Sequence, residues 1–153
     1  MATLAGVDEQ APSVLKETPS WLLTQSAMHA HRIISEAFAA GGARGYHFRL
    51  LATLAEFGPA SQASLGRRTG IDRSDVVAAI NELAAAGFVD RSPDPEDGRR
   101  NIITLTTAGK RQQKRLAELV RKAQDELFAP LSAAERDQLS RLLGKVLSHH
   151  DGG

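Results

Sequence analysis

Two short predicted helices, separated by one glycine turn, constrain the fold of this chain most. The first covers residues 61–69 and ends at Gly70, and the second covers residues 72–86 and ends at Gly87. Two helices that pack across a turn within about 25 residues form a helix-turn-helix. The second helix has one apolar face, which consists of Val76, Ala79, Ile80 and Leu83.

The polar residues at the helix starts support this interpretation. Ser61 and Asp72 belong to the residue types that cap helix N-termini, and Asp75 is spaced to complete a capping box with Asp72. Gly66 lies inside the first helix, where glycine costs about 1 kcal/mol relative to alanine. The glycine weakens this helix but does not exclude it.

The segments around this pair predict the rest of the fold. Residues 88–91 and 101–106 are rich in residues that favour strands, and the turn-rich segment 92–98 joins them into a β-hairpin. The fold class is therefore mainly α (α+β), a winged helix-turn-helix with long N- and C-terminal helices. Apolar periodicity places the other helices at residues 18–40, 45–57, 107–128 and 132–148. Residues 1–15 lack this periodicity and are expected to form a flexible tail.

Charge and cysteine content restrict the function. The formal net charge is only +1, but residues 99–122 hold eight of the 19 lysines and arginines and a single acidic residue, Glu118. The chain has no cysteine, which excludes a disulfide scaffold, a thiolate zinc site and a cysteine nucleophile. The N-terminus resembles no signal peptide, and no apolar run reaches the roughly 20 residues of a membrane span. We therefore expect a cytoplasmic protein with no membrane partner.

The second helix and the hairpin predict a DNA-binding surface. A helix with an exposed polar face fits the major groove, where arginine reads guanine, asparagine reads adenine and small apolar side chains contact the thymine methyl group. Arginines at a hairpin tip suit a narrow minor groove. The residues expected to read the major groove are Arg73, Ser74, Val77, Ala78 and Asn81, and those expected to enter the minor groove are Arg99 and Arg100. The residues expected to contact the DNA backbone are Ser61, Gln62, Arg67 and Arg68. The alternative is that this helix face is polar only because it is exposed to solvent. We expect Asp97 to orient Arg99.

The stretch from Ser61 to Arg111 resembles the MarR family of winged-helix regulators. The family signature is Asp-x-Arg, five residues, then Leu-Thr, and it matches here from Asp97 to Thr106 without interruption. The resemblance implies a homodimer that binds double-stranded DNA at a pseudopalindromic operator. It implies one domain over about residues 16–149, in which residues 46–106 bind DNA and residues 16–45 and 107–149 form dimerisation helices.

The resemblance also implies a possible small-molecule effector, aromatic or anionic, held between the dimerisation helices and the DNA-binding lobe. The residues that this position could offer are Trp21, His29, Tyr46, His47 and Arg49. A guanidinium among apolar neighbours can bind a carboxylate in bidentate fashion, which makes Arg49 the sharpest candidate. The alternatives are that Arg49 forms an ion pair with Glu36 or Glu56 or is solvated, and that Trp21 and Tyr46 have a packing role. The spacing of the histidines predicts no metal site and no cofactor.

These observations predict a sequence-specific transcriptional regulator, most simply a homodimeric repressor released by a ligand. One alternative is an architectural protein that binds DNA without regard to sequence. Another is a helical protein-interaction module whose winged helix has lost its DNA affinity. The residues form no catalytic triad and no phosphate-binding glycine loop, so an enzyme is not expected.

Overall fold

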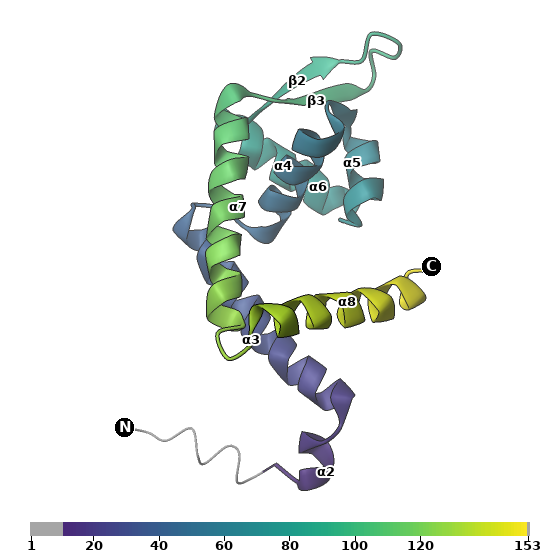
Figure 1. Ribbon diagram of the computed structural model, residues 1–153. Coiled ribbons are helices and arrows are strands. Elements are labelled where there is room, and N and C mark those ends of the chain that lie inside the picture. The colour runs from purple at the N-terminus through teal and green to yellow at the C-terminus, as the bar shows by residue number, and fades with distance from the viewer. Residues whose placement is uncertain (1–10, 153) are drawn as a thin grey trace.

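The computed structural model describes residues 11–152, and it consists of helices around a small antiparallel sheet (Figure 1). Its order of elements confirms the winged helix-turn-helix fold with long terminal helices. The elements are α2 (Ser13–Lys16), α3 (Pro19–Ala40), α4 (Gly45–Phe57), β1 (Ala60–Ser61), α5 (Gln62–Thr69), α6 (Arg73–Ala85), β2 (Val89–Pro93), β3 (Asn101–Leu105), α7 (Thr107–Leu127) and α8 (Ala133–His150).

The helix-turn-helix is made by α5 and α6, which meet across Gly70. This glycine has φ 69°, a left-handed conformation that glycine adopts without steric cost. The Oγ atom of Ser61 caps α5 by accepting from Ser64 N at 3.1 Å. At the start of α6, the Asp72 carboxylate accepts from the backbone and the hydroxyl of Ser74, at 3.2 and 2.6 Å.

These hydrogen bonds from Ser74 lower the pKa of the Asp72 carboxyl group. The reciprocal bond expected from Asp75 is not formed in the part of the chain that the structure describes. The capping box predicted for α6 was therefore wrong. The cap comes from Asp72 alone, whose carboxylate accepts from the backbone of Ser74 rather than from that of Asp75.

The sheet has three strands in the order β1-β3-β2, one more than the predicted hairpin. Strand β1 contains two residues, and Ser61 both pairs with Ile102 and caps α5. Such a short strand has no period that sequence reading could detect. Strand β2 also continues to Pro93, beyond the predicted end at Arg91, and a proline is tolerated there because β2 is an edge strand.

The apolar core lies among α4, α5, α6, the sheet and the first half of α7. Its fully buried side chains include Leu50, Leu51, Leu65, Ile80, Ile103 and Leu116. The predicted inner face of α6 is confirmed, since Val76, Ala79, Ile80 and Leu83 are all buried. The opposite face of α6 is thereby turned outwards.

A buried hydrogen bond links the two long helices α3 and α7, which also contribute Phe38 and Leu116 to this core. The side-chain amide of Gln112 in α7 donates to the carbonyl of Gly41, at the end of α3, over 3.0 Å. Helix α3 packs on α7, whereas α8 has no buried residue and projects from the end of α7 (Figure 1). None of the helices in residues 11–152 is long and apolar enough to cross a membrane.

The N-terminal prediction needs a partial correction. Residues 1–15 were expected to form a tail, but Ser13–Lys16 form the one-turn helix α2, and Thr18 N donates to Leu15 O at 2.9 Å. Residues 1–10 lie outside the described residues. The turn forms because Pro12 supplies a preset φ before it and a carbonyl that accepts from Leu15 and Lys16.

Replacing Gly66 by alanine is expected to stabilise the protein by about 0.5–1 kcal/mol, because alanine loses less conformational entropy in a helix. A Cβ atom at this position would lie 3.6 Å from Ile71 O and 3.7 Å from Val76 Cγ2, which is ordinary van der Waals contact. Urea unfolding at a fixed protein concentration measures the change. A lower midpoint for Gly66→Ala would show that the turn after α5 cannot accept the added methyl group.

Candidate nucleic-acid interface

The outer face of α6 presents the predicted groove-reading residues. Arg73, Ala78 and Asn81 are exposed, and Val77 is 41% exposed although it is apolar. The structure therefore brings these side chains to one helix face that does not pack into the core. An exposed valine beside an arginine and an asparagine is a surface suited to base edges and thymine methyl groups.

Two of the predicted contacts on α6 have partners within the protein. The Ser74 hydroxyl donates to Asp72, so its first role is to close the helix cap. The Asn81 Oδ1 atom accepts from the Arg91 guanidinium on β2. Sequence reading missed Arg91, which ties α6 to the sheet and adds a cation beside Asn81.

The hairpin between β2 and β3 carries two exposed cations, Arg99 and Arg100. The side chain of Arg99 is 94% exposed and that of Arg100 is 69% exposed. Asp97 Oδ1 accepts from Arg99 N at 3.1 Å and from its Nε at 3.4 Å, and Asp97 Oδ2 lies 3.8 Å from Arg100 Nε. Asp97 thus holds the turn that presents both arginines, and the hairpin extends well beyond the body of the protein (Figure 1).

The residues predicted to contact the DNA backbone lie at both ends of α5. Ser61 and Gln62 are half-buried at its start, whereas Arg67 and Arg68 are exposed in its last turn. The Arg68 guanidinium lies over the ring of Phe57, 4.2 Å from its centroid. This stacking orients Arg68, and its N–H groups donate to no other residue in 11–152, so they can donate to phosphates.

A cluster of Arg44, His47 and Glu82 fixes the position of α6 against α4. Glu82 Oε2 lies 2.6 Å from His47 Nε2 and 2.5 Å from Arg44 Nη2, and His47 Nδ1 accepts from Arg44 N at 3.2 Å. Both ring nitrogens of the buried His47 are therefore hydrogen-bonded, and its side chain also lines a second pocket together with Glu82 and Gln112. Sequence spacing contains no signal for this contact, because Glu82 lies far from both partners in the chain.

Replacing Glu82 by glutamine is expected to lower stability at neutral pH and to have no effect in acid. Hydrogen bonds from Arg44, which has the larger effect, and from His47 lower the pKa of Glu82 below its ordinary value of 4.5. A lowered pKa stabilises the fold above the unfolded-state pKa, and the stabilisation disappears as the pH falls through the folded-state pKa. Urea unfolding of both proteins from pH 7 to pH 3 checks this. If the difference in unfolding free energy between the two proteins did not change with pH, the electrostatic origin of the effect would be contradicted.

The other predicted effector residues do not meet in one cavity of the protomer. Arg49 lies 5.9 Å from the centre of the Tyr46 ring, on the exposed surface of α4, and Glu36 pairs with Arg32 at 3.6 Å. Trp21 is half-buried near the start of α3, about 30 Å from Gly41 at a helical rise of 1.5 Å per residue. His29 is exposed on the same helix. A shared effector site for all five residues stays a prediction.

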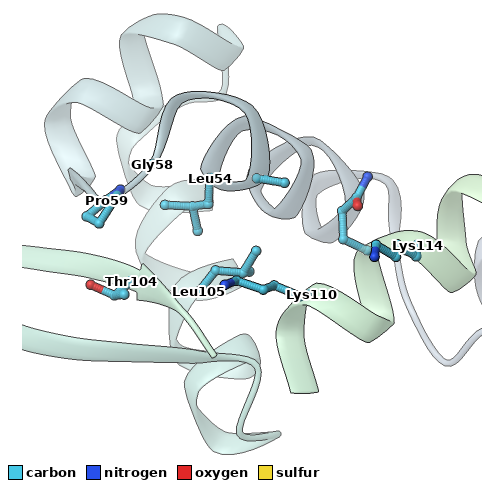
Figure 2. A pocket seen from close by; sticks show the side chains of 9 residues that line it. Leu54, Gly58, Pro59, Thr104, Leu105, Lys110 and Lys114 are labelled. Carbon is cyan, nitrogen blue, oxygen red and sulfur yellow. The ribbon is translucent and has the colours of Figure 1, made fainter. Parts of the chain in front are cut away.

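A pocket of about 470 Å³ lies elsewhere, between α4, β3 and the start of α7 (Figure 2). Leu54 faces Leu105 across it, and Lys110 and Lys114 extend from α7 at one side. Sequence reading assigned neither lysine to a ligand. Their only signal was membership of the basic stretch, which does not reveal that α4 lies opposite. Among the residues described, no three His, Cys, Asp or Glu side chains gather to hold a metal ion.

Comparisons with known proteins agree with this geometry. Residues 43–100 match the profile of the MarR family. The transcriptional repressor NicR of Pseudomonas putida is 32% identical over 65% of this chain and 63% of its own length. A probable transcriptional regulator from Pseudomonas aeruginosa has a TM-score of 0.75 at 30% identity, covering 86% of this chain and 98% of that one.

A third similar protein is BpsR of Bordetella bronchiseptica, whose structure concerns regulation of its DNA binding by 6-hydroxynicotinic acid. It is 26% identical, with a TM-score of 0.71 over 82% of this chain and 95% of that one. The alignments span between 47% and 63% of the length of the first curated relatives. These relatives are regulators rather than enzymes. With the winged helix-turn-helix, the uninterrupted Asp97 to Thr106 signature and these matches in agreement, the chain belongs to the MarR family of transcriptional regulators.

Proposed function

We propose that this chain forms a homodimeric repressor that binds a pseudopalindromic operator and is released by a small anionic ligand. The exposed arginines of the hairpin carry the proposal, since Arg99 is held out from the protein by Asp97 and has no other anionic partner among the described residues. The exposed face of α6 supplies groove-reading side chains, and the Arg91 contact links it to the same hairpin. These two features would supply the major-groove and minor-groove parts of a DNA contact.

The direct test is selection of bound sequences from random duplex DNA, followed by competition with unrelated duplex. We expect the selected sites to contain two related half-sites about one helical turn apart. Unrelated duplex should compete at least a thousandfold less well. Equal competition by unrelated duplex would favour the architectural alternative. An absence of DNA binding at low salt would favour the protein-interaction alternative.

The terminal helices support the homodimer. Helix α8 exposes an apolar stripe that consists of Leu142, Leu143, Val146 and Leu147, and α3 exposes Leu22, Leu23 and Met28. Monomeric proteins seldom expose continuous apolar surface of this extent. A second copy of the chain can cover these stripes in a symmetric interface, in which the same patch is used by both subunits. The two α6 helices of the dimer would then be presented together to DNA.

Replacing Val146 by glutamate is expected to weaken the dimer by at least tenfold. Val146 is 51% exposed in the single chain, so the substitution should leave the protomer folded. In the dimer it would bury a charge from each subunit. Sedimentation velocity over a concentration series measures the change. Ser148→Glu, on the opposite side of α8, is the matched control, and equal effects of the two variants would contradict the assigned interface.

The ligand response rests on similarity and on a cavity of suitable size. DNA binding by the related BpsR is regulated by 6-hydroxynicotinic acid, a small aromatic acid. The present chain has a pocket of about 470 Å³, within the range of small-molecule sites. Titrating a preformed complex of protein and selected operator with small aromatic acids tests release. If no such acid lowers operator occupancy, this part of the proposal is wrong.

A further inference from the structure

Arg91 on β2 contacts a side chain that is proposed to read bases. Its guanidinium donates to Oδ1 of Asn81, on the outer face of α6, and both residues are exposed. In the described residues 11–152, Arg91 forms no ion pair with a carboxylate. Because the amide of Asn81 carries no charge, this contact orients Arg91 without neutralising it.

The strand and the helix fix both ends of this contact. Arg91 pairs with Ile103 of β3, and it leaves β2 on the same face as the buried Val89, because residues two apart in a strand share a face. Helix α6 packs against β2. On α6, Asn81 lies one turn after the exposed Val77. The contact therefore lies between the outer face of α6 and the hairpin.

The chemistry of the guanidinium determines which way the amide of Asn81 is turned. An arginine side chain has five N–H donors and no acceptor, so only the oxygen of an amide can bond to it. The oxygen of Asn81 is therefore directed towards Arg91. The amide NH2 group of Asn81, which carries two donors, is left to interact with a base.

This orientation changes the base that the asparagine suits. An asparagine reads adenine when its oxygen accepts from N6 while its NH2 group donates to N7. In this chain, an adenine N6 group that approached the oxygen of Asn81 would also meet the N–H groups of Arg91, donor against donor. Guanine presents two neighbouring acceptors in the major groove, N7 and O6, and no donor. A side-chain pair that offers only donors therefore fits guanine better than adenine.

We infer that Arg91 is a positioning residue that sets the base specificity of Asn81, so that Asn81 selects guanine rather than adenine in each half-site of the operator. This assignment deepens the proposed DNA binding and rests on it. Arg91 acts through the amide that it orients, whereas Asn81 touches the base. The base preference of this helix face then depends on a residue of the sheet, and not on α6 alone.

The test measures the affinity of the full chain for selected operator duplexes that differ at one base pair in each half-site. Asn81→Ala identifies the position that Asn81 reads, because the preference at that position is lost in this variant. At this position, wild-type protein is expected to bind guanine at least tenfold more tightly than adenine, since a well-placed pair of hydrogen bonds discriminates by about this factor or more. Fluorescence anisotropy at one salt concentration measures both affinities.

Four variants separate positioning from a merely structural contact. Arg91→Ala frees the amide to turn, so adenine should be bound at least as tightly as guanine. Arg91→Lys keeps a donor for the oxygen of Asn81 and should retain the preference for guanine. Asn81→Asp keeps an acceptor for Arg91 but removes the donors, so it should lose that preference while the contact persists. Arg32→Ala removes an equal charge from α3 and should leave the preference unchanged.

A measurement without DNA separates this inference from the proposed function. In the free protein, the side-chain amide signals of Asn81 should shift in Arg91→Ala and not in Arg32→Ala; unchanged signals in Arg91→Ala would overturn the inference whatever the DNA result. Protein that selects an operator but prefers adenine at this position, or keeps its preference in Arg91→Ala, would overturn the inference and leave the DNA-binding function standing. Protein that selects no operator would overturn both.

Discussion

Arg99→Ala is expected to lower operator affinity by roughly 1–3 kcal/mol for each half-site, and both half-sites of a dimer would be affected. The side chain is 94% exposed and is oriented by Asp97, so alanine removes an interaction with DNA without disturbing the core. The dependence of affinity on salt should also become shallower, by about one unit of slope for each phosphate interaction that the substitution removes. Fluorescence anisotropy over a range of salt concentrations measures both quantities.

The matched control for Arg99 is Arg32→Ala. Arg32 also carries one positive charge on the surface, but it lies on α3 and pairs with Glu36. Its removal changes the net charge equally, so it should alter operator affinity only slightly. Equal affinities for Arg99→Ala and wild-type protein at every salt concentration would exclude a role of the hairpin in DNA binding.

Gly109→Ala is expected to destabilise the protein by about 3 kcal/mol or more. This cost lies at or above the upper end of the range usual for overpacking, because the added methyl group would displace backbone atoms. A Cβ atom at Gly109 would lie 2.0 Å from Phe88 O and 2.9 Å from Leu105 Cδ1. Phe88 O already accepts from Thr106 N at 3.1 Å, so it cannot retreat without breaking the joint between β2 and α7. Thermal and urea unfolding at one protein concentration measure the destabilisation.

The comparison of Gly109→Ala with Gly66→Ala isolates the physical cause. Both variants add one methyl group to a helix, but the space at Gly66 admits it and the space at Gly109 does not. The expected changes in unfolding free energy therefore have opposite signs. If both variants stabilised the protein, helix propensity would outweigh packing at Gly109 and the close approach to Phe88 would have no energetic importance.

The joint at Gly109 also matters for the proposed function. Thr106 Oγ1 accepts from Gly109 N at 2.9 Å and donates to Gly87 O at 2.7 Å, so the end of α6, the base of the hairpin and the start of α7 are held together. A variant that opens this joint would displace the hairpin from α6. Gly109→Ala does not change the charge of the protein. We nevertheless expect the folded variant to bind operator more weakly than the wild-type protein does.

Local features of the sequence determined the fold class and most helix ends. The stripe of Val76, Ile80 and Leu83 predicts the buried face of α6, and Ser61 and Asp72 predict the caps that the structure contains. The hairpin signature from Asp97 to Thr106 likewise indicates the family. These signals are readable because helix periodicity, capping and turn chemistry depend on residues within a few positions of each other.

Tertiary structure alone decided which distant residues meet. It pairs Glu82 of α6 with His47 of α4, two residues that lie far apart in the chain. It adds strand β1, and it places Lys110 and Lys114 opposite Leu54 in a pocket that the charge count could not locate. The physical reason is that such contacts depend on how helices and strands cross after the core has packed. No repeating pattern in the sequence predicts how the helices and strands cross. The helices and strands themselves can be predicted, because they depend on the spacing of residues that are close together in the chain.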